Sequence, residues 1–209
     1  KRRDKGATGA DFALPTGQSV QIRGTADRAL PEAIQGGPTM REVIWGVDTQ
    51  SELDKIGAEL SKDREVKRDG AGGLHTQDDI GLKIGFRVAA PGVDPLGPKR
   101  RAVNEVVEPG KPPELIRMGH VVFFCPKGQT QKASDFYMKR LNFRLSDRAL
   151  DLGDFLRAPG SPWHHNLFFL SVTPKAGWNH VAFDVADMND VVSGGHNMLK
   201  KGYKAYSSP

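Results

Sequence analysis

The alternation of apolar and polar residues predicts a series of short strands along the chain. Helical spacing of apolar residues predicts three helices between them. The first follows Ser51 as its N-cap and carries Leu53, Ile56 and Leu60 on one face. The second covers 131–141, and the third begins at about Asn189. The predicted strands cover 11–14, 19–23, 41–47, 82–88, 118–124, 143–148, 153–158, 165–172 and 178–185. Mixed strands and helices of this kind predict an α+β protein.

One strand-turn-helix pattern recurs along the chain. When 41–62 is laid on 179–200, Trp45 falls on Phe183 and Leu53 on Val191, and 118–141 follows the same plan. Such in-register matches favour a duplicated module over a chance likeness between two βα units. In this alignment, Glu42 stands where the later copy has His180.

A change in composition divides the chain. Residues 91–114 are rich in proline, glycine and charged residues and show no sustained period, which predicts a linker. We therefore expect an N-terminal domain over 1–90 and a C-terminal domain over 115–209.

Composition and charge restrict the possible functions. With 38% apolar and 26% charged residues, the chain has the composition of a soluble globular protein, and no stretch is long and apolar enough to cross a membrane. The net charge is +5, but the basic clusters Lys1–Arg3 and Lys99–Arg101 have no aromatic residues among them, which argues against nucleic-acid binding. The single cysteine, Cys125, is expected to be buried and favours a reducing, cytoplasmic location.

Histidines gather at the starts of the later strands. His120, the pair His164–His165, and His180 each stand at or near the beginning of an apolar run. A neutral imidazole at such a place is a good ligand for a divalent metal, and three such strands in about sixty residues favour a metal site over packing. His75, in a Gly-rich hairpin, and His196, in the last helix, are expected at the surface.

The later motifs resemble those of a known family. Gly119-His120-Val121-Val122, Leu141–Arg148, Phe155–Ala158, Trp163-His164-His165-Asn166-Leu167 and Trp178–Phe183 are similar to motifs of the type I extradiol catechol dioxygenases, members of the vicinal oxygen chelate superfamily. The resemblance implies paired βαβββ modules in two domains, of which the N-terminal one is non-catalytic.

The resemblance also implies a set of site residues. His120 and His180 match the metal ligands, and His165 matches the catalytic histidine, with His164 as its structural neighbour. Adjacent histidines in a strand point to opposite faces, so the choice of His165 comes from the resemblance. Phe155 matches a residue that lines the substrate pocket, and Val122 is expected on the same face.

The family's third ligand is a late glutamate, which we expect beyond Pro209, in a chain that we expect to be cut at both ends. Asp184 is no substitute, because four strand residues place it about 13 Å from His180 at ~3.3 Å per residue.

The function implied is extradiol ring cleavage, in which O2 is inserted into a catechol-type diol at non-haem Fe(II), with Mn(II) as the alternative metal. A homo-oligomer that binds neither nucleic acid nor membrane is expected. Two alternatives stay open: a glyoxalase-like lyase or isomerase, which does not need the oxygen-side role of His165, and a metal-free, antibiotic-sequestering binding protein of the same fold.

Overall fold

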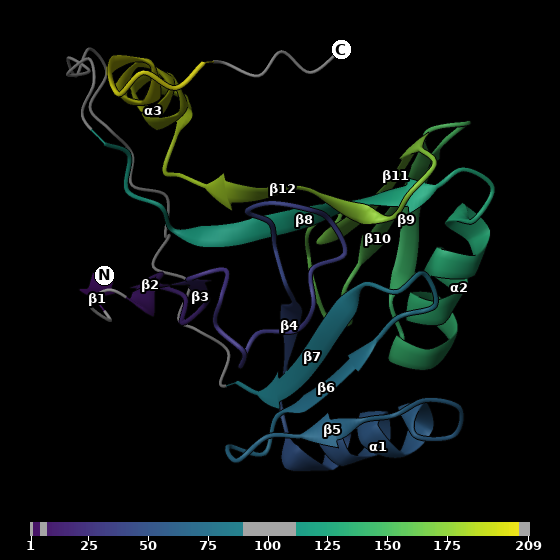
Figure 1. Cartoon of the computed structure of the whole chain (residues 1–209). Helices are drawn as coiled ribbons and strands as arrows, with labels where there is room; N and C mark the ends of the chain where they lie inside the picture. The colour runs from purple at the N-terminus through teal and green to yellow at the C-terminus, as the bar shows by residue number, and fades with distance from the viewer. Residues whose placement is uncertain (1, 5–7, 90–111, 205–209) are drawn as a thin grey trace.

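The computed structural model describes residues 2–4, 8–89 and 112–204 and has the expected α+β architecture (Figure 1). Residues 91–111 of the predicted linker lie outside the described residues. Among the helices within the described ranges, none has the length and apolar character needed to cross a lipid bilayer.

A complete βαβββ unit, here called the first unit, follows the N-terminal strands. Its elements are β4 (Val43–Val47), α1 (Gln50–Leu60), β5 (Lys67–Arg68), β6 (Leu74–Gln77) and β7 (Lys83–Val88). The strand order is β4-β7-β6-β5, with β4 parallel to β7 and the other pairs antiparallel. The predicted helix and its apolar face are confirmed, since Leu53 and Leu60 are buried and Ile56 packs against them.

The start of α1 differs from the prediction. Thr49, and not Ser51, is the N-cap: its side chain accepts from the backbone N–H of Glu52, and the Glu52 carboxylate accepts from the N–H of Thr49. This reciprocal capping box needs an acidic residue three positions after the cap, and Glu52 meets that requirement for Thr49.

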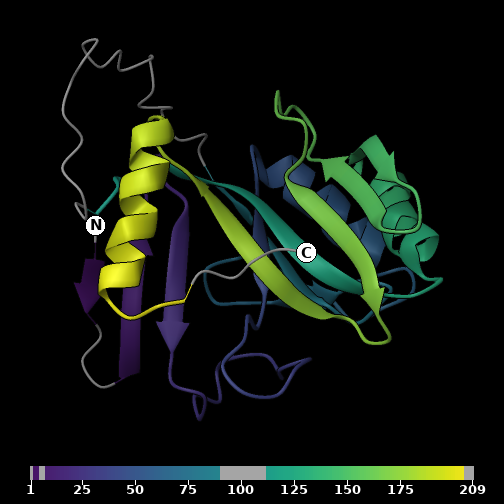
Figure 2. The same ribbon diagram turned by 90° about the horizontal axis from the view of Figure 1, so that it is seen from above.

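The second unit repeats this topology. Its elements are β8 (Arg117–Pro126), α2 (Thr130–Leu141), β9 (Arg144–Ala149), β10 (Gly153–Arg157) and β11 (Leu167–Thr173). A further strand, β12 (Gly177–Asp184), pairs antiparallel with β8 and leads into α3 (Met188–Lys200), giving a sheet of order β12-β8-β11-β10-β9 (Figure 2). The first strand of a new strand-helix pair thus lies beside the first strand of the second unit.

The N-terminal strands form a separate small sheet. β1 (Arg2–Asp4), β2 (Gly9–Ala13) and β3 (Ser19–Arg23) are antiparallel neighbours in that order. The predicted turn between β2 and β3 is present, with Gly17 at φ 81°, a left-handed conformation that favours glycine. Gln18 in this turn exchanges two hydrogen bonds with the backbone of Met118 in β8, at 2.8 and 3.1 Å, and so ties the small sheet to the second unit.

One continuous apolar core joins the two units. It contains Leu53, Leu60 and Phe86 from the first unit together with Phe123 and Tyr137 from the second. Polar contacts support it at the helices, where Arg140 of α2 reaches Glu59 of α1 and Asp63 in the turn that follows α1. The helices α1 and α2 lie on the same side of the molecule (Figure 1). The predicted domain boundary between 90 and 115 therefore separates two units that pack closely, and the division itself stays a prediction.

Candidate metal centre

Two histidines from neighbouring strands meet on one face of the five-stranded sheet. His120 comes from β8 and His180 from β12, and their Nε2 atoms are 3.3 Å apart. The antiparallel register pairs His180 with Val122 and Ala182 with His120, so the two histidines come from adjacent rows of the sheet. Both side chains project from the face of the sheet opposite to the core. Val121 and Phe123 of β8 point into the core, so His120, which alternates with them, points the other way. The register puts His180 on the same face as His120.

The spacing of these nitrogens suits a shared metal ion. Two imidazole nitrogens bound about 2.1 Å from one ion, at tetrahedral or octahedral angles, lie roughly 3.0–3.4 Å apart. The Nδ1 of His180 lies 2.5 Å from Asn179 Oδ1. An amide oxygen can only accept, so Nδ1 carries the proton and Nε2 keeps its lone pair, the arrangement of a metal-binding histidine.

Electrostatics favour neutral rings at this centre. Burial lowers the pKa of His120, and the nearby His180 lowers it further. Burial also lowers the pKa of His180. Neutral imidazole is the form that binds metal, so both side chains are ready ligands at neutral pH.

His165 joins the pair from the loop before β11. Its ring centroid lies 4.4 Å from that of His120, with the ring planes tilted by 38°. Burial, followed by repulsion from His120 and then from the other two histidines, lowers the pKa of His165 to about 4. This side chain is therefore a neutral base beside the His120–His180 pair.

His164 and His165 lie side by side, so the prediction that they point to opposite faces of a strand is wrong. His164 Nδ1 lies 3.0 Å from His165 Nδ1, and both rings contact Phe155, at 5.5 and 4.9 Å between centroids. The reason is local: β11 begins only at Leu167, and side chains alternate strictly only within a strand.

An apolar row lies beside the histidines. Val122 in β8, Phe168 in β11 and Phe155 in β10 are register partners across three neighbouring strands, and Val122 is in turn opposite His180. Phe155 and Phe168 stack with centroids 4.0 Å apart and planes within 8°. Val122 is 2% exposed, so it forms the floor of the row and leaves the two phenylalanines to offer aromatic surface. Phe168 was not predicted from the sequence as part of the site, because only the strand register places it beside Phe155.

The carboxylate near this centre is occupied elsewhere. Asp184, at the end of β12, forms an ion pair with Arg117 Nε and stands so close to Gly119 that a Cβ there would meet its Oδ1 at 2.7 Å. Among the residues that the structure describes, no three His, Cys, Asp or Glu side chains group in a way that could hold a metal ion. The third ligand expected beyond Pro209 therefore stays a prediction.

Two contacts that sequence reasoning missed hold the loop of residues 158–166, which carries His164 and His165. The Arg117 guanidinium lies over the ring of Trp163, 3.6 Å from its centroid, a cation–π contact at the middle of the loop. Asn166, at the end of the loop, hydrogen-bonds to Gly119 in β8 and to Ala158 at the start of the loop. The sequence shows that Trp163 and Asn166 flank the two histidines, but it does not show that they contact Arg117 and Gly119.

The first unit holds a different polar cluster. His75 in β6 is 29% exposed at its side chain and lies between two carboxylates, with Nδ1 2.8 Å from Glu42 Oε1 and Nε2 3.1 Å from Asp69 Oδ2. His75 is therefore a partly exposed histidine, paired with Asp69 of its own hairpin and with Glu42, which precedes β4. The two ring nitrogens face opposite ways, so the three groups do not converge on one point.

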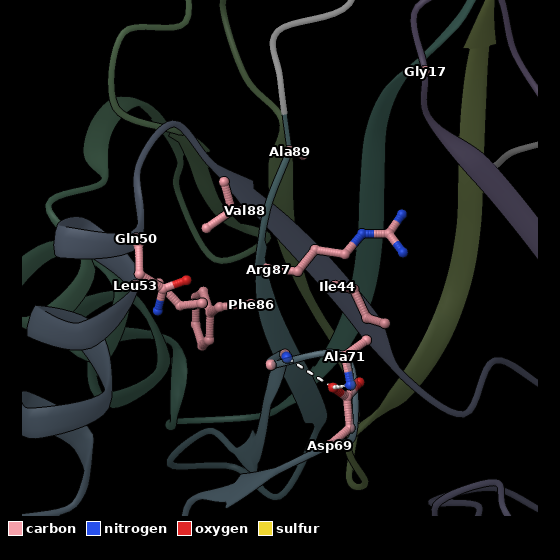
Figure 3. A pocket seen from close by; sticks show the side chains of 12 residues that line it. Gly17, Ile44, Gln50, Leu53, Asp69, Ala71, Phe86, Arg87, Val88 and Ala89 are labelled. Atoms are coloured by element: carbon pink, nitrogen blue, oxygen red, sulfur yellow. Dashed lines mark hydrogen bonds between the residues drawn. The ribbon is translucent and has the colours of Figure 1, made fainter.

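A cavity of about 460 Å³ lies on this unit (Figure 3). Asp69 lines it, and its Oδ1 accepts hydrogen bonds from the N–H groups of Ala71 and Gly73 at 2.9 and 2.8 Å. The other lining residues are Gly17, Ile44, Gln50, Leu53, Ala71, Gly72, Gly73, Phe86, Arg87, Val88 and Ala89. None of them is a histidine, so this cavity is separate from the His120–His180 centre.

Comparison with known proteins agrees with this architecture. No protein-family profile matches the chain. Over 87 residues the chain is 44% identical to metapyrocatechase 2 of Cupriavidus necator, a match that covers 42% of this chain and 26% of that protein. The chain thus spans about a quarter of the length of this curated relative.

Solved structures match over nearly the whole chain. The Mn(II)-bound glyoxalase from Novosphingobium aromaticivorans superposes with a TM-score of 0.69 at 22% identity, covering 97% of this chain and 62% of that one. A catechol 2,3-dioxygenase superposes with a TM-score of 0.68 at 16% identity, covering 98% and 68%. The protein has the vicinal oxygen chelate fold of paired βαβββ units, as predicted. Within that fold, its sequence resembles the extradiol catechol dioxygenases, through its match to a metapyrocatechase.

Proposed function

We propose that this protein is an extradiol ring-cleaving dioxygenase that acts on a catechol-type diol and O2 at a metal ion bound by His120 and His180. The observation that carries the proposal is the pair of Nε2 atoms 3.3 Å apart with the neutral His165 ring 4.4 Å away. The names of the metapyrocatechase relative and of the dioxygenase neighbours support the same reaction class.

The proposed ligand set is two histidines and one carboxylate. His120 and His180 supply the two neutral imidazoles, and a glutamate beyond Pro209 supplies the third ligand. This donor set suits non-haem Fe(II), with Mn(II) as the alternative. The chemistry that the metal would supply is electron transfer between an aromatic diol and O2, together with a lowered pKa for the bound diol.

His165 has the role of a proton-transfer residue in this proposal. Its pKa of about 4 leaves a ring nitrogen free to accept a proton from a diol hydroxyl and to return it later in the reaction. The contact between His164 Nδ1 and His165 Nδ1, at 3.0 Å, orients the ring so that its other nitrogen can face the substrate.

Phe155 and Phe168 provide the substrate surface. Their stacked rings lie across β10 and β11, one row from His120, and a flat aromatic substrate can pack on them while its oxygens face the histidines. Such packing excludes water and favours aromatic over aliphatic substrates. Val122 supports this surface from below. The two-domain division, the non-catalytic N-terminal domain and a homo-oligomeric state belong to the same proposal.

A metal-dependent lyase or isomerase is the second candidate. The Mn(II)-bound glyoxalase, with a TM-score of 0.69, favours it, since the same fold carries that chemistry in a protein so named. The position of His165 beside His120 argues for the dioxygenase, because a Lewis-acid reaction has no need of a base at the oxygen side.

The first test uses the full-length protein, reconstituted anaerobically with Fe(II) and then given O2 and a panel of catechols, biphenyl-type diols and hydroxylated ring acids. We expect oxygen uptake and a yellow ring-opened product with at least one diol. His165→Ala should lower kcat by roughly 10²- to 10⁴-fold, because a positioned acid–base group contributes about that much, while the metal stays bound.

His164→Ala is the comparison variant, since it removes the contact that orients His165 but keeps the His165 imidazole itself, and its effect should be smaller. Iron-loaded wild-type protein that consumes no oxygen with any diol would rule out the dioxygenase. Turnover of a glyoxalase-type substrate without oxygen would then support the lyase or isomerase.

A further inference from the structure

Asn166 bonds to the backbone on both sides of His120. Its side-chain Nδ2 donates to the Gly119 carbonyl at 3.2 Å, and its own carbonyl accepts from the Val121 N–H at 3.0 Å. The strand β8 is therefore held to Asn166 at the residue before the candidate ligand and at the residue after it.

The same residue bonds to the strand that carries Phe155. The Asn166 N–H donates to the Leu156 carbonyl at 2.9 Å, and the side-chain Oδ1 accepts from the Ala158 N–H at 3.1 Å. All four hydrogen bonds of Asn166 go to backbone groups, which do not move with side-chain rotamers. Because Asn166 directly follows His165, the loop ends at a point fixed to both neighbouring strands.

The carboxamide group suits this junction for a specific reason. One end must donate to a carbonyl and the other must accept from an N–H, and a primary amide does both at a spacing that bridges the two strands. Aspartate keeps the acceptor and loses the donor, and leucine, of similar shape, loses both. Asn166, Gly119 and Ala158 are all half-buried, so losing either side-chain bond leaves a partly desolvated carbonyl or N–H group without its partner.

We infer that Asn166 is a positioning residue: its carboxamide fixes the end of the 158–166 loop to the backbone beside His120 and thereby holds the His165 ring against the metal centre. This inference rests on the proposed function for its kinetic consequence. Its structural part, the distance between His165 and His120, does not.

The kinetic test compares Asn166→Leu and Asn166→Asp with the wild-type enzyme. A misplacement of about 1 Å can cost around 10²-fold in rate, so we expect Asn166→Leu to lower kcat by roughly 10- to 100-fold with KM for the diol changed by less than about threefold. Asn166→Asp, which keeps one of the two side-chain bonds, should fall between leucine and wild type. A Co(II) titration of each variant should give wild-type affinity, because His120 and His180 are untouched.

The structural test needs no metal and no substrate. In protein with isotope-labelled histidines, the ring protons of His120 and His165 should give a nuclear Overhauser effect, since their centroids are 4.4 Å apart. Asn166→Leu should weaken or abolish this signal, and Asn166→Asp should reduce it less.

Thr173→Val is the matched control. Thr173 lies at the other end of β11, and its hydroxyl donates to the Lys175 carbonyl at 2.7 Å, so the variant also loses a side-chain-to-backbone bond from the same strand. It should keep both kcat and the histidine signal. The inference is overturned if Asn166→Leu keeps the wild-type signal, or if its kcat falls no further than that of Thr173→Val.

The two proposals can fail separately. If the wild-type protein turns over no diol but Asn166→Leu still loses the histidine signal, the dioxygenase function fails and the positioning role stands. If the wild-type protein is active and Asn166→Leu keeps both the histidine signal and kcat, the positioning role fails and the dioxygenase function stands.

Discussion

The first and second units build the same sheet and place different side chains at equivalent points of it. In the first unit, Ile44, Gly85 and His75 are register partners across β4, β7 and β6. In the second unit, the corresponding row across β8, β11 and β10 is Val122, Phe168 and Phe155. A glycine and a histidine thus take the places of two stacked phenylalanines, and only the second unit offers a flat aromatic surface.

The strand that opens each unit shows a second difference. Val43 and Trp45 of β4 pack against the core, as Val121 and Phe123 of β8 do, so Glu42 stands where His120 stands. Glu42 binds His75 and does not face a second ligand, whereas His120 faces His180. The same backbone position therefore supports a structural ion pair in one unit and a candidate metal ligand in the other.

The third difference lies between the last two strands of each unit. In the first unit, residues 78–82 make a short turn, closed by Asp78 Oδ1, which accepts from the N–H groups of Ile80 and Leu82. In the second unit, the connection is the longer 158–166 loop with His164 and His165. The tight turn brings no histidine to such a place, whereas the longer loop brings His165 beside the candidate ligand His120.

The largest effect expected from this comparison concerns metal affinity. His180→Ala should weaken Fe(II) or Co(II) binding by at least about 100-fold, because losing a ligand costs more than the roughly 10- to 100-fold that follows loss of an outer-shell partner. Glu42→Ala, at the equivalent place in the first unit, should leave metal affinity unchanged. Anaerobic titration monitored by Co(II) absorbance measures both.

A double variant sharpens the same comparison. His120→Ala combined with His180→Ala should retain no stoichiometric iron, manganese or zinc, since the first unit is proposed to bind none. Stoichiometric metal in this variant, with circular dichroism showing an intact fold, would contradict the division of roles between the units.

The next effect concerns the contact between the units and its pH dependence. Asp78 is buried, and its Oδ2 accepts from the hydroxyl of the fully buried Tyr137 at 3.2 Å. Burial outweighs the hydrogen bonds and raises the pKa of Asp78 from 3.8 to about 6. The folded-state pKa lies above the unfolded value, so the stabilisation from protonated Asp78 is complete below pH 3.8 and is lost as the pH rises through about 6.

Asp78→Asn should remove this pH dependence. At about 1.4 kcal/mol per pKa unit, the shift corresponds to roughly 3 kcal/mol, so the variant should gain on the order of that amount relative to wild type between pH 3.8 and neutrality. Urea unfolding across this range measures the difference. Tyr137→Phe is the control: it keeps the carboxyl and should keep the sign of the pH dependence. Because the Tyr137 hydrogen bond lowers the pKa of Asp78, its loss should widen the dependence. If the difference in unfolding free energy between Asp78→Asn and wild type did not change with pH, Asp78 would ionise normally in the folded protein.

Local patterns were enough to predict most of the fold. Period-two alternation located β8, β11 and β12, and the apolar face of Leu53 and Leu60 located α1, because these signals depend on burial of one face. The candidate ligand pair His120 and His180 was also suggested by sequence, since both histidines lie near the starts of related strands.

What the sequence could not predict depends on register and on distant partners. Phe168 joins the site only because it is opposite Phe155, and Asn166 is significant only because its amide reaches Gly119 on another strand. The pairing of Arg140 with Glu59 and Asp63 likewise joins residues far apart in the chain. Such contacts leave no periodic trace, so the sequence gives no local signal for them.

The smallest expected effect tests the first unit's own histidine. Burial opposes a charge on His75, but hydrogen bonds to Asp69 and then to Glu42 outweigh it, so the pKa of His75 is raised above 6.5. The stability that charged His75 contributes is therefore fully present below pH 6.5 and is lost as the pH rises through the folded-state pKa. Because the ring is 29% exposed and its partners lie near the surface, the contribution should be under about 1 kcal/mol.

His75→Gln should accordingly destabilise the protein more near pH 5.5 than near pH 8.5, by less than about 1 kcal/mol, and added salt should shrink the difference. Urea unfolding of both proteins at the two pH values measures it, with His196→Gln, on the exposed side of α3, as the control. A destabilisation equal at both pH values would mean that Glu42 and Asp69 hold a neutral ring. The His75 ring of the first unit would then be neutral, like the histidines of the second unit, and the two units would differ only in which side chains they carry.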